Sequence, residues 1–180
     1  MPRREQSARE QSLNPAMENY LKAIFLIENR DGAARPSAIG DMTKVARSTV
    51  SGALNSLKNM GYVEYSPYSL IRLTEQGKVI GRKIVHRHIV LHSFLENILQ
   101  VDSQEAHAAA CELEHMVSED IVQRFGKFIL FLKSREEFWS DWQEVYEKES
   151  IQKNFHSSSA MSEILKQELR HIADLPTPNE

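Results

Sequence analysis

Apolar residues recur at intervals of three and four along most of the chain, a spacing that places them on one face of a helix. The first such stretch begins at Pro15 and ends near Asn29, ahead of the helix-breaking pair Asp31-Gly32. A short second helix is expected over 38–43, and a third over 47–60. The pattern therefore predicts three helices in the first third of the chain.

Between Tyr62 and Leu73 the spacing changes to an alternation of polar and apolar residues around a turn at 66–69. We expect a small antiparallel hairpin there. Helix, turn, helix and hairpin in this order indicate a winged helix-turn-helix, in which one helix lies in the major groove of DNA.

The start of the third helix is rich in short hydroxyl side chains and includes a glycine, so that the backbone can come close to phosphate. Winged helices also serve as protein-interaction modules, but the hydroxyl-rich start favours DNA. The residues predicted to contact DNA are Ser37, Arg47, Ser48, Thr49, Ser51, Gly52, Asn55, Tyr68 and Arg72.

Helical spacing continues after the hairpin. A long amphipathic helix is expected from Thr74 to about Leu99, and a second one after Asp102 to about Arg124, with Gly126 separating it from an apolar run at 128–132. Helices that are apolar on more than one side favour a dimer interface. The predicted organisation is a flexible arm at 1–15, a winged helix at 16–75, a helical domain at 76–133 and an acidic helical extension at 134–180.

Composition narrows the class of protein. The chain has 180 residues, 41% of them hydrophobic, and no apolar run approaches the ~20 residues needed to span a bilayer. The first ten residues lack the apolar core of a signal peptide, which predicts a cytoplasmic protein without a membrane partner. The net charge of −3 comes from residues 134–180, with 5 basic and 10 acidic residues, whereas residues 1–75 have 10 basic and 8 acidic ones. A local basic surface is therefore compatible with DNA binding.

Histidine and cysteine are concentrated in one part of the helical region. Five of the seven histidines and the single cysteine lie between residues 86 and 115. His107, Cys111 and His115 are four residues apart, a spacing that places side chains on one face of a helix, and His88 and His92 form a second such pair. Imidazole, thiolate and the adjacent Glu114 carboxylate suit iron, manganese, cobalt or zinc.

Three alternatives compete with a regulatory metal site. A lone histidine or cysteine in a helix is usually an ordinary surface or core residue. A metallohydrolase would use Glu114 as a general base, but the chain has no H-E-x-x-H helix, phosphate loop or nucleophile elbow, and we expect no enzymatic activity. A winged-helix regulator of an organic ligand, with a structural histidine cluster, stays open.

The order of these motifs resembles the diphtheria-toxin-repressor family of metal-dependent transcriptional repressors. The likeness spans roughly residues 14–132. It rests on Met17-Glu18-Asn19-Tyr20-Leu21-Lys22-Ala23-Ile24, Ser48-Thr49-Val50-Ser51, Leu73-Thr74-x-x-Gly77, Arg87-His88 and Cys111-Glu112-Leu113-Glu114-His115-x-x-Ser118. The fold class implied is mainly α, a winged helix followed by an all-helical metal-binding and dimerisation domain, in the form that lacks the family's third, β-barrel domain.

The resemblance also implies a ligand set and a mechanism. The primary site would be Cys111, Glu114 and His115 with Asn19 from the first helix, and the ancillary site His88, His92 and His107. Asn19 stands where the family has methionine or aspartate, and Lys22 where the manganese branch has a second carboxylate. A homodimer would bind a palindromic operator in double-stranded DNA with Fe²⁺ or Mn²⁺ as corepressor, and Zn²⁺ or Co²⁺ as possible substitutes.

Overall fold

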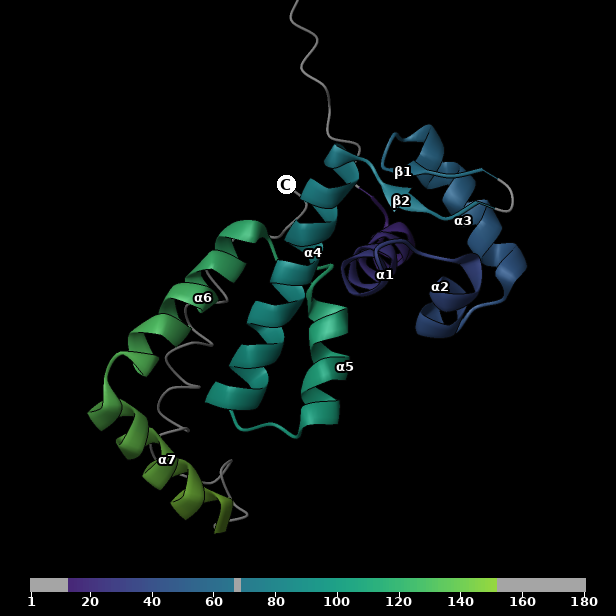
Figure 1. Ribbon diagram of the computed structural model, residues 1–180. Coiled ribbons are helices and arrows are strands. Elements are labelled where there is room, and N and C mark those ends of the chain that lie inside the picture. The colour runs from purple at the N-terminus through teal and green to yellow at the C-terminus, as the bar shows by residue number, and fades with distance from the viewer. Residues whose placement is uncertain (1–12, 67–68, 152–180) are drawn as a thin grey trace, which may run out of the picture. The chain divides into compact units, whose positions relative to one another are not determined.

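The computed structural model describes residues 13–66 and 69–151, apart from the side chains of residues 136 and 145–151. The chain divides into two compact units, residues 1–127 and 128–180, which are described separately. Both contain helices, and the strands of the described residues belong to the first unit (Figure 1). The predicted fold class, mainly α with a small hairpin, is confirmed.

The first unit begins with the three helices that the spacing predicts. They are α1 (Pro15–Asp31), α2 (Pro36–Thr43) and α3 (Arg47–Asn59). The Asn14 side chain caps α1 by accepting a hydrogen bond from the Met17 amide, and Gly32 ends it at a φ of +80°. Only a residue without Cβ adopts that φ readily, so the glycine fixes the end of the helix.

A short hairpin follows the three helices. It consists of β1 (Val63–Glu64) and β2 (Arg72–Leu73), antiparallel, with Val63 opposite Leu73. The strands are shorter than the alternating pattern suggested, and the turn between them includes residues 67 and 68, outside the described part. An isolated bridge from Ala34 to Ile71 ties the hairpin to the segment before α2.

Three more helical segments belong wholly to the first unit. They are α4 (Glu75–Ser93), a π-helical turn η1 (Phe94–Ile98) that continues it, and α5 (Ser103–Leu113), which the Asp102 side chain caps. α6 (Glu119–Lys133) spans the boundary between the units, and α7 (Glu136–Ile151) lies in the second. The predicted helix in residues 134–173 is thus present up to residue 151, and the remainder lies outside the described residues.

Two helix boundaries differ from the prediction. The helix that carries His107 ends at Leu113 instead of continuing to Arg124, and α6 runs through Gly126 instead of stopping there. Ser118 followed by two acidic residues is a helix-start signal that the apolar pattern concealed. A glycine inside a helix costs about 1 kcal/mol relative to alanine, which a well-packed helix tolerates.

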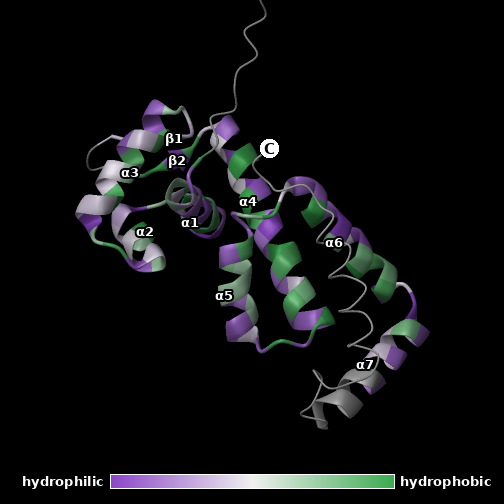
Figure 2. Ribbon diagram, turned by 180° about the vertical axis from the view of Figure 1, so that it is seen from behind, coloured by the Kyte–Doolittle hydropathy of each residue, from purple (hydrophilic) through white to green (hydrophobic). Residues whose placement is uncertain are grey.

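Packing places α1 at the centre of the first unit, where it contacts α2, α3, β2 and α4. The hydrophobic core lies between these elements and includes Leu21, Ile24, Leu54, Leu57 and Ile71, all at most 1% exposed. Figure 2 shows that α1, α4 and α5 each carry both hydrophobic and hydrophilic residues along their length. These helices therefore have polar faces available beside the core.

One close approach brings α1 and α4 together. A Cβ added at Gly81 of α4 would lie 2.9 Å from Cδ2 of Phe25 on α1, so a larger residue would push the two helices apart. Lys22 on α1 and His88 on α4 lie one to two turns from this point. The glycine therefore helps to set the distance across which the polar side chains described below meet.

None of the helices in the described part of the chain is both long enough and apolar enough to cross a lipid bilayer.

Candidate metal centre and DNA-binding surface

His88, His107 and Cys111 come together where α4 and α5 pack. One potential ligand atom from each lies within 4.8 Å of the other two. Cys111 Sγ is 3.8 Å from His107 Nε2 and 4.0 Å from His88 Nδ1. Two imidazole nitrogens and a sulfur in this arrangement fit a first-row divalent ion such as Fe²⁺, Co²⁺ or Zn²⁺.

The protonation states of this cluster in the metal-free protein follow from its surroundings. His107 is exposed, but the part of its ring that is desolvated lowers its pKa, and the charges of His88 and Lys22 lower it further. Burial raises the pKa of the Cys111 thiol. The imidazole of His107 is thus kept ready to bind a metal, whereas the thiol must release a proton to bind one.

His92 lies beside the cluster. Its ring centroid is 6.0 Å from that of His88 and 6.1 Å from that of His107. Its Nδ1 lies 3.4 Å from a carboxylate oxygen of Glu96, one turn further along the chain. The structure therefore brings the three histidines of the expected ancillary set together, and Cys111 of the expected primary set joins them.

Glu114 is the one buried polar or charged residue among the described residues, with 0% exposure. Its Oε1 is 2.6 Å from Lys22 Nζ, and its Oε2 is 2.7 Å from His88 Nδ1. Burial alone would raise the pKa of Glu114, but the hydrogen bonds to His88 and Lys22 outweigh it and leave the pKa below its usual value. The carboxylate is therefore ionised and paired with the Lys22 ammonium.

His115 lies beyond the end of α5, in the turn before α6, and faces α1. Its Nδ1 is 2.6 Å from Glu18 Oε2, while Arg87 donates to the other oxygen of Glu18 at 2.8 Å. His115 Nε2 is buried without a hydrogen-bond partner, 3.7 Å from Glu114 Oε1. A buried imidazole nitrogen in that state is an available metal ligand.

Asn19 is exposed, and among the described residues its side chain makes no hydrogen bond to these groups. The side chains of α1 that reach the site are Glu18 and Lys22. The sequence analysis noted Lys22 only as standing where the manganese branch has a carboxylate, and it gave neither Glu18 nor Arg87 a role in the site. The available signal for Lys22 was the resemblance itself, which places it at a helix-one ligand position of the manganese branch.

The predicted DNA-binding residues lie mainly at the start of α3. Arg47, Ser48 and Thr49 are exposed in its first turn, and Asn55 is exposed further along. A Cβ at Gly52 would meet nothing within 4 Å. Packing within the chain therefore does not explain this glycine, whereas a close approach to a phosphate would.

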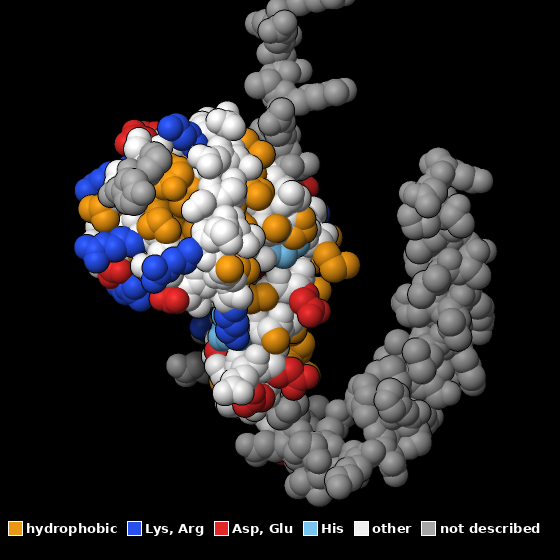
Figure 3. All heavy atoms as spheres, turned by 90° about the vertical axis from the view of Figure 1, so that its right-hand side faces the viewer, with side chains coloured by type: hydrophobic (Ala, Val, Ile, Leu, Met, Phe, Trp, Pro, Cys, Tyr) orange, Lys and Arg blue, Asp and Glu red, His pale blue; other side chains and the backbone are white. Residues whose placement is uncertain are grey.

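A hollow of about 540 Å³ lies between the start of α2, α3 and the hairpin, and its lining includes Ser37, Arg47 and Ser51. Figure 3 shows Lys and Arg side chains gathered at the winged-helix end of the molecule. Arg72 on β2 is exposed and donates to the Gly32 carbonyl at 3.2 Å. Tyr68 lies outside the described residues.

A winged helix whose first helix contacts a group of metal-ligating side chains defines a class of protein, the metal-responsive DNA-binding regulators. The chain belongs to the iron dependent repressor family: residues 12–71 match its N-terminal DNA binding domain and residues 74–137 its metal binding and dimerisation domain. The resemblance read from the sequence is thereby confirmed.

Individual relatives agree with this assignment. An uncharacterized HTH-type transcriptional regulator of Methanocaldococcus jannaschii is 31% identical over 68% of this chain and 99% of its own length. The transcriptional regulator MntR of Bacillus pumilus is 32% identical over 68% of this chain and 85% of its own. A solved manganese-dependent transcriptional repressor, in complex with manganese, shares 28% identity with a TM-score of 0.59. That match covers 64% of this chain and 53% of the solved one, so the chain spans about half the length of that structure.

Proposed function

We propose that this protein is a cytoplasmic, homodimeric transcriptional repressor whose corepressor is Fe²⁺ or Mn²⁺, held by His88, His107 and Cys111. The observation that carries the proposal is the convergence of these three ligand atoms within 4.8 Å, directly beside the first helix of the winged helix. The names of the family and of its relatives support metal response and regulation of transcription.

His88 belongs to α4, whereas His107 and Cys111 belong to α5. A divalent ion bound by all three would therefore link the two helices and hold them at a fixed distance. α4 begins directly after the wing and packs on α1, so an ion that fixes α5 against α4 also fixes the helical domain relative to the winged helix. Operator binding then depends on the ion through the position of α3.

The donor set bears on the choice of ion. A thiolate and two imidazoles favour the softer Fe²⁺ over Mn²⁺, and Zn²⁺ or Co²⁺ can replace either ion at such a site. Mn²⁺ would gain from a carboxylate ligand, and Glu114, the nearest one, is held by Lys22. We therefore propose Fe²⁺ as the stronger corepressor.

The dimer and its operator follow from the same family. The domain matched by residues 74–137 is described as a dimerisation domain, and Ile121 in α6 is 47% exposed. A two-fold dimer places two α3 helices against half-sites roughly 34 Å apart, which requires a palindromic operator.

Operator binding with and without metal tests this proposal. A duplex is first selected from random sequence with the metal-loaded protein, and its affinity is then measured by anisotropy with Fe²⁺ or Mn²⁺ under anaerobic conditions, or with chelator. The wild-type protein should bind at least tenfold more tightly with metal. Cys111→Ala and His107→Ala should lose that difference.

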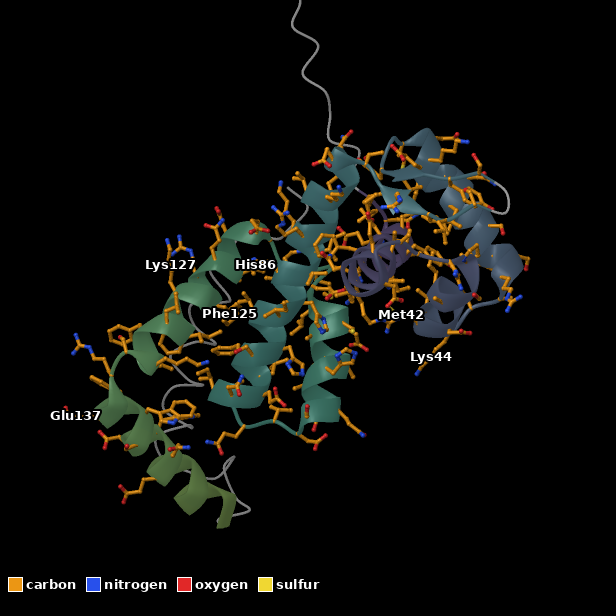
Figure 4. All side chains as sticks on the ribbon, in the orientation of Figure 1. Met42, Lys44, His86, Phe125, Lys127 and Glu137 are labelled. Atoms are coloured by element: carbon orange, nitrogen blue, oxygen red, sulfur yellow. The ribbon has the colours of Figure 1, made fainter. Side chains whose placement is uncertain are left out.

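His86 provides the matched control. It is an exposed histidine of α4, on the side of the helix away from α5 (Figure 4). His86→Ala should respond to metal like the wild-type protein. If Cys111→Ala keeps the full metal response, or if the wild-type protein binds operator equally well in chelator, the proposal is wrong.

A further inference from the structure

Lys22 occupies the space between three side chains that a metal ion would otherwise share. Its ammonium nitrogen lies 2.6 Å from Glu114 Oε1, 3.4 Å from His88 Nδ1 and 3.9 Å from Cys111 Sγ. An ammonium ion with oxygen, nitrogen and sulfur acceptors around it has the surroundings of a bound cation. The lysine side chain is only 14% exposed, so this position is largely shielded from water.

The groups around Lys22 form an incomplete second metal site. Glu114 is fully buried, and His115 Nε2 lies 3.7 Å from Glu114 Oε1 with no hydrogen-bond partner of its own. A carboxylate oxygen and an unpartnered imidazole nitrogen at that separation are a pair of ligands for one ion. The same Oε1 atom is the one that contacts Lys22. A metal ion cannot bind this oxygen while the ammonium holds it at hydrogen-bond distance. The ammonium lies further from His88 Nδ1 and Cys111 Sγ, at 3.4 and 3.9 Å, so it weakens an ion held by those two atoms without taking their place as ligands.

We propose that Lys22 is a built-in cation that takes the place of a second metal ion, so that each chain binds one ion and not two. The ammonium joins α1 of the winged helix to Glu114 at the end of α5 without any metal. Glu18, one turn before Lys22, reinforces the joint through Arg87 and His115. The second ion excluded by Lys22 is the one that Glu114 and His115 would bind. The inference rests on the proposed function only in assuming that the one ion still bound lies at His88, His107 and Cys111.

The direct test is the number of ions bound per chain. Equilibrium dialysis against Mn²⁺, and separately Co²⁺, should give one ion for the wild-type protein. Lys22→Met removes the charge and leaves Glu114 and His115 free to bind, so that variant should bind two. Its first Mn²⁺ should also bind more tightly, by about tenfold or more, because a positive charge beside the site is gone.

Two further variants guard against a trivial result. Lys22→Arg retains a cation and should keep one ion per chain, although its geometry differs. The double variant Lys22→Met, Glu114→Gln also removes the buried carboxylate, so no unpaired buried charge is left that could prevent folding. Because the carboxylate ligand is gone, this variant should again bind one ion. Lys83→Met, an exposed lysine of α4, controls for the loss of a charge near the site.

The outcomes separate this inference from the proposed function. If the Lys22→Met protein, folded by circular dichroism, still binds one ion at wild-type affinity, the role assigned to Lys22 is wrong. A second ion that persists after Glu114→Gln is added contradicts it too. The absorption band of Co²⁺ bound to a thiolate tests the proposed site at Cys111 separately. If the wild-type protein shows this band and Cys111→Ala lacks it, the proposed function is supported independently of the result for Lys22.

Discussion

The winged helix and the helices that follow it are stabilised in different ways. Residues 13–84 form one continuous hydrophobic core around Leu21, Ile24 and Leu54. In contrast, the buried residues of α5 are the small Ala106 and Ala110, next to the buried carboxylate of Glu114. The winged helix is therefore held together mainly by apolar packing, whereas α5 also meets α4 and α1 through the charge pairs of Glu114 and carries two of the proposed metal ligands. Sensitivity to metal follows from that difference.

Truncating the winged-helix core should have the largest effect on stability. Leu54 is 1% exposed, and Leu54→Ala should lower the free energy of unfolding of the metal-free protein by about 2–5 kcal/mol, because it leaves a cavity. Urea unfolding followed by circular dichroism measures this. The loss should be equally large with and without metal; a loss that metal abolishes would contradict the separation of the two regions.

Metal should stabilise the protein through the second region. At a free concentration of 100 times the dissociation constant, one bound ion should raise the free energy of unfolding by about 2.7 kcal/mol. His107→Ala should abolish that gain while changing the stability of the metal-free protein little, since this side chain is exposed. Thermal unfolding with Co²⁺ or chelator gives the comparison, with His86→Ala as control. An equal gain in His107→Ala would exclude this histidine as a ligand.

Arg47 tests the reading head without involving the metal. It is exposed at the first position of α3, where side chains of a recognition helix reach the duplex. Arg47→Ala should cost about 1–3 kcal/mol at one operator base pair if it contacts a base, or lower the salt slope by about one if it contacts phosphate. Metal affinity should stay unchanged. A variant that binds every duplex like wild type at all salt concentrations would remove Arg47 from the interface.

Acid should destabilise the helices that follow the winged helix more than the winged helix itself. The folded protein holds the pKa of Glu114 below its ordinary value of 4.5, so the carboxylate contributes stability above that value, and the contribution is lost as the pH falls through the lower, folded-state pKa. Metal-free Glu114→Gln should therefore be less sensitive than wild type to a fall from pH 6 to pH 3. Glu112→Gln, an exposed neighbour, is the matched control. Identical acid profiles for wild type and Glu114→Gln would contradict the ion pair.

The smallest effect is expected at Asn19, which the family resemblance placed among the ligands. Its side chain is exposed and makes no hydrogen bond to a site residue in the described part of the chain. Asn19→Ala should change Mn²⁺ and Fe²⁺ affinity less than about twofold, in contrast to Lys22→Met. A chelator-competition titration of both variants measures this. A loss of metal affinity in Asn19→Ala would restore the helix-one ligand and place α1 differently against α5.

The two regions also differ in how far the sequence predicts them. Periodicity, the Asn14 cap and the Gly32 stop locate the helices of the winged helix to within two residues, because local signals and burial agree there. The clustering of histidine and cysteine identifies the site, and the helical spacing of His107 and Cys111 is correct. Continuing that spacing to His115 is wrong, since α5 ends at Leu113.

The ion pair between Lys22 and Glu114 was not predicted from the sequence, although the resemblance had placed Lys22 at a ligand position of the manganese branch. Lys22 is 92 residues away, and only the approach of α1 to α4 at Gly81 brings its ammonium to the carboxylate. No local pattern encodes such a contact. A lysine beside an apolar stripe is equally compatible with a side chain whose ammonium extends into water.

The central claim is that one ion links α4 to α5, whereas the winged helix is already rigid without metal. Amide hydrogen exchange with and without metal is its most direct test. We predict that Mn²⁺ or Fe²⁺ increases protection in the second half of α4 and in α5, that α1 and α3 core amides stay at their metal-free values, and that His107→Ala removes the increase. Protection that rises equally throughout residues 15–60, or an increase that survives in His107→Ala, would contradict the account.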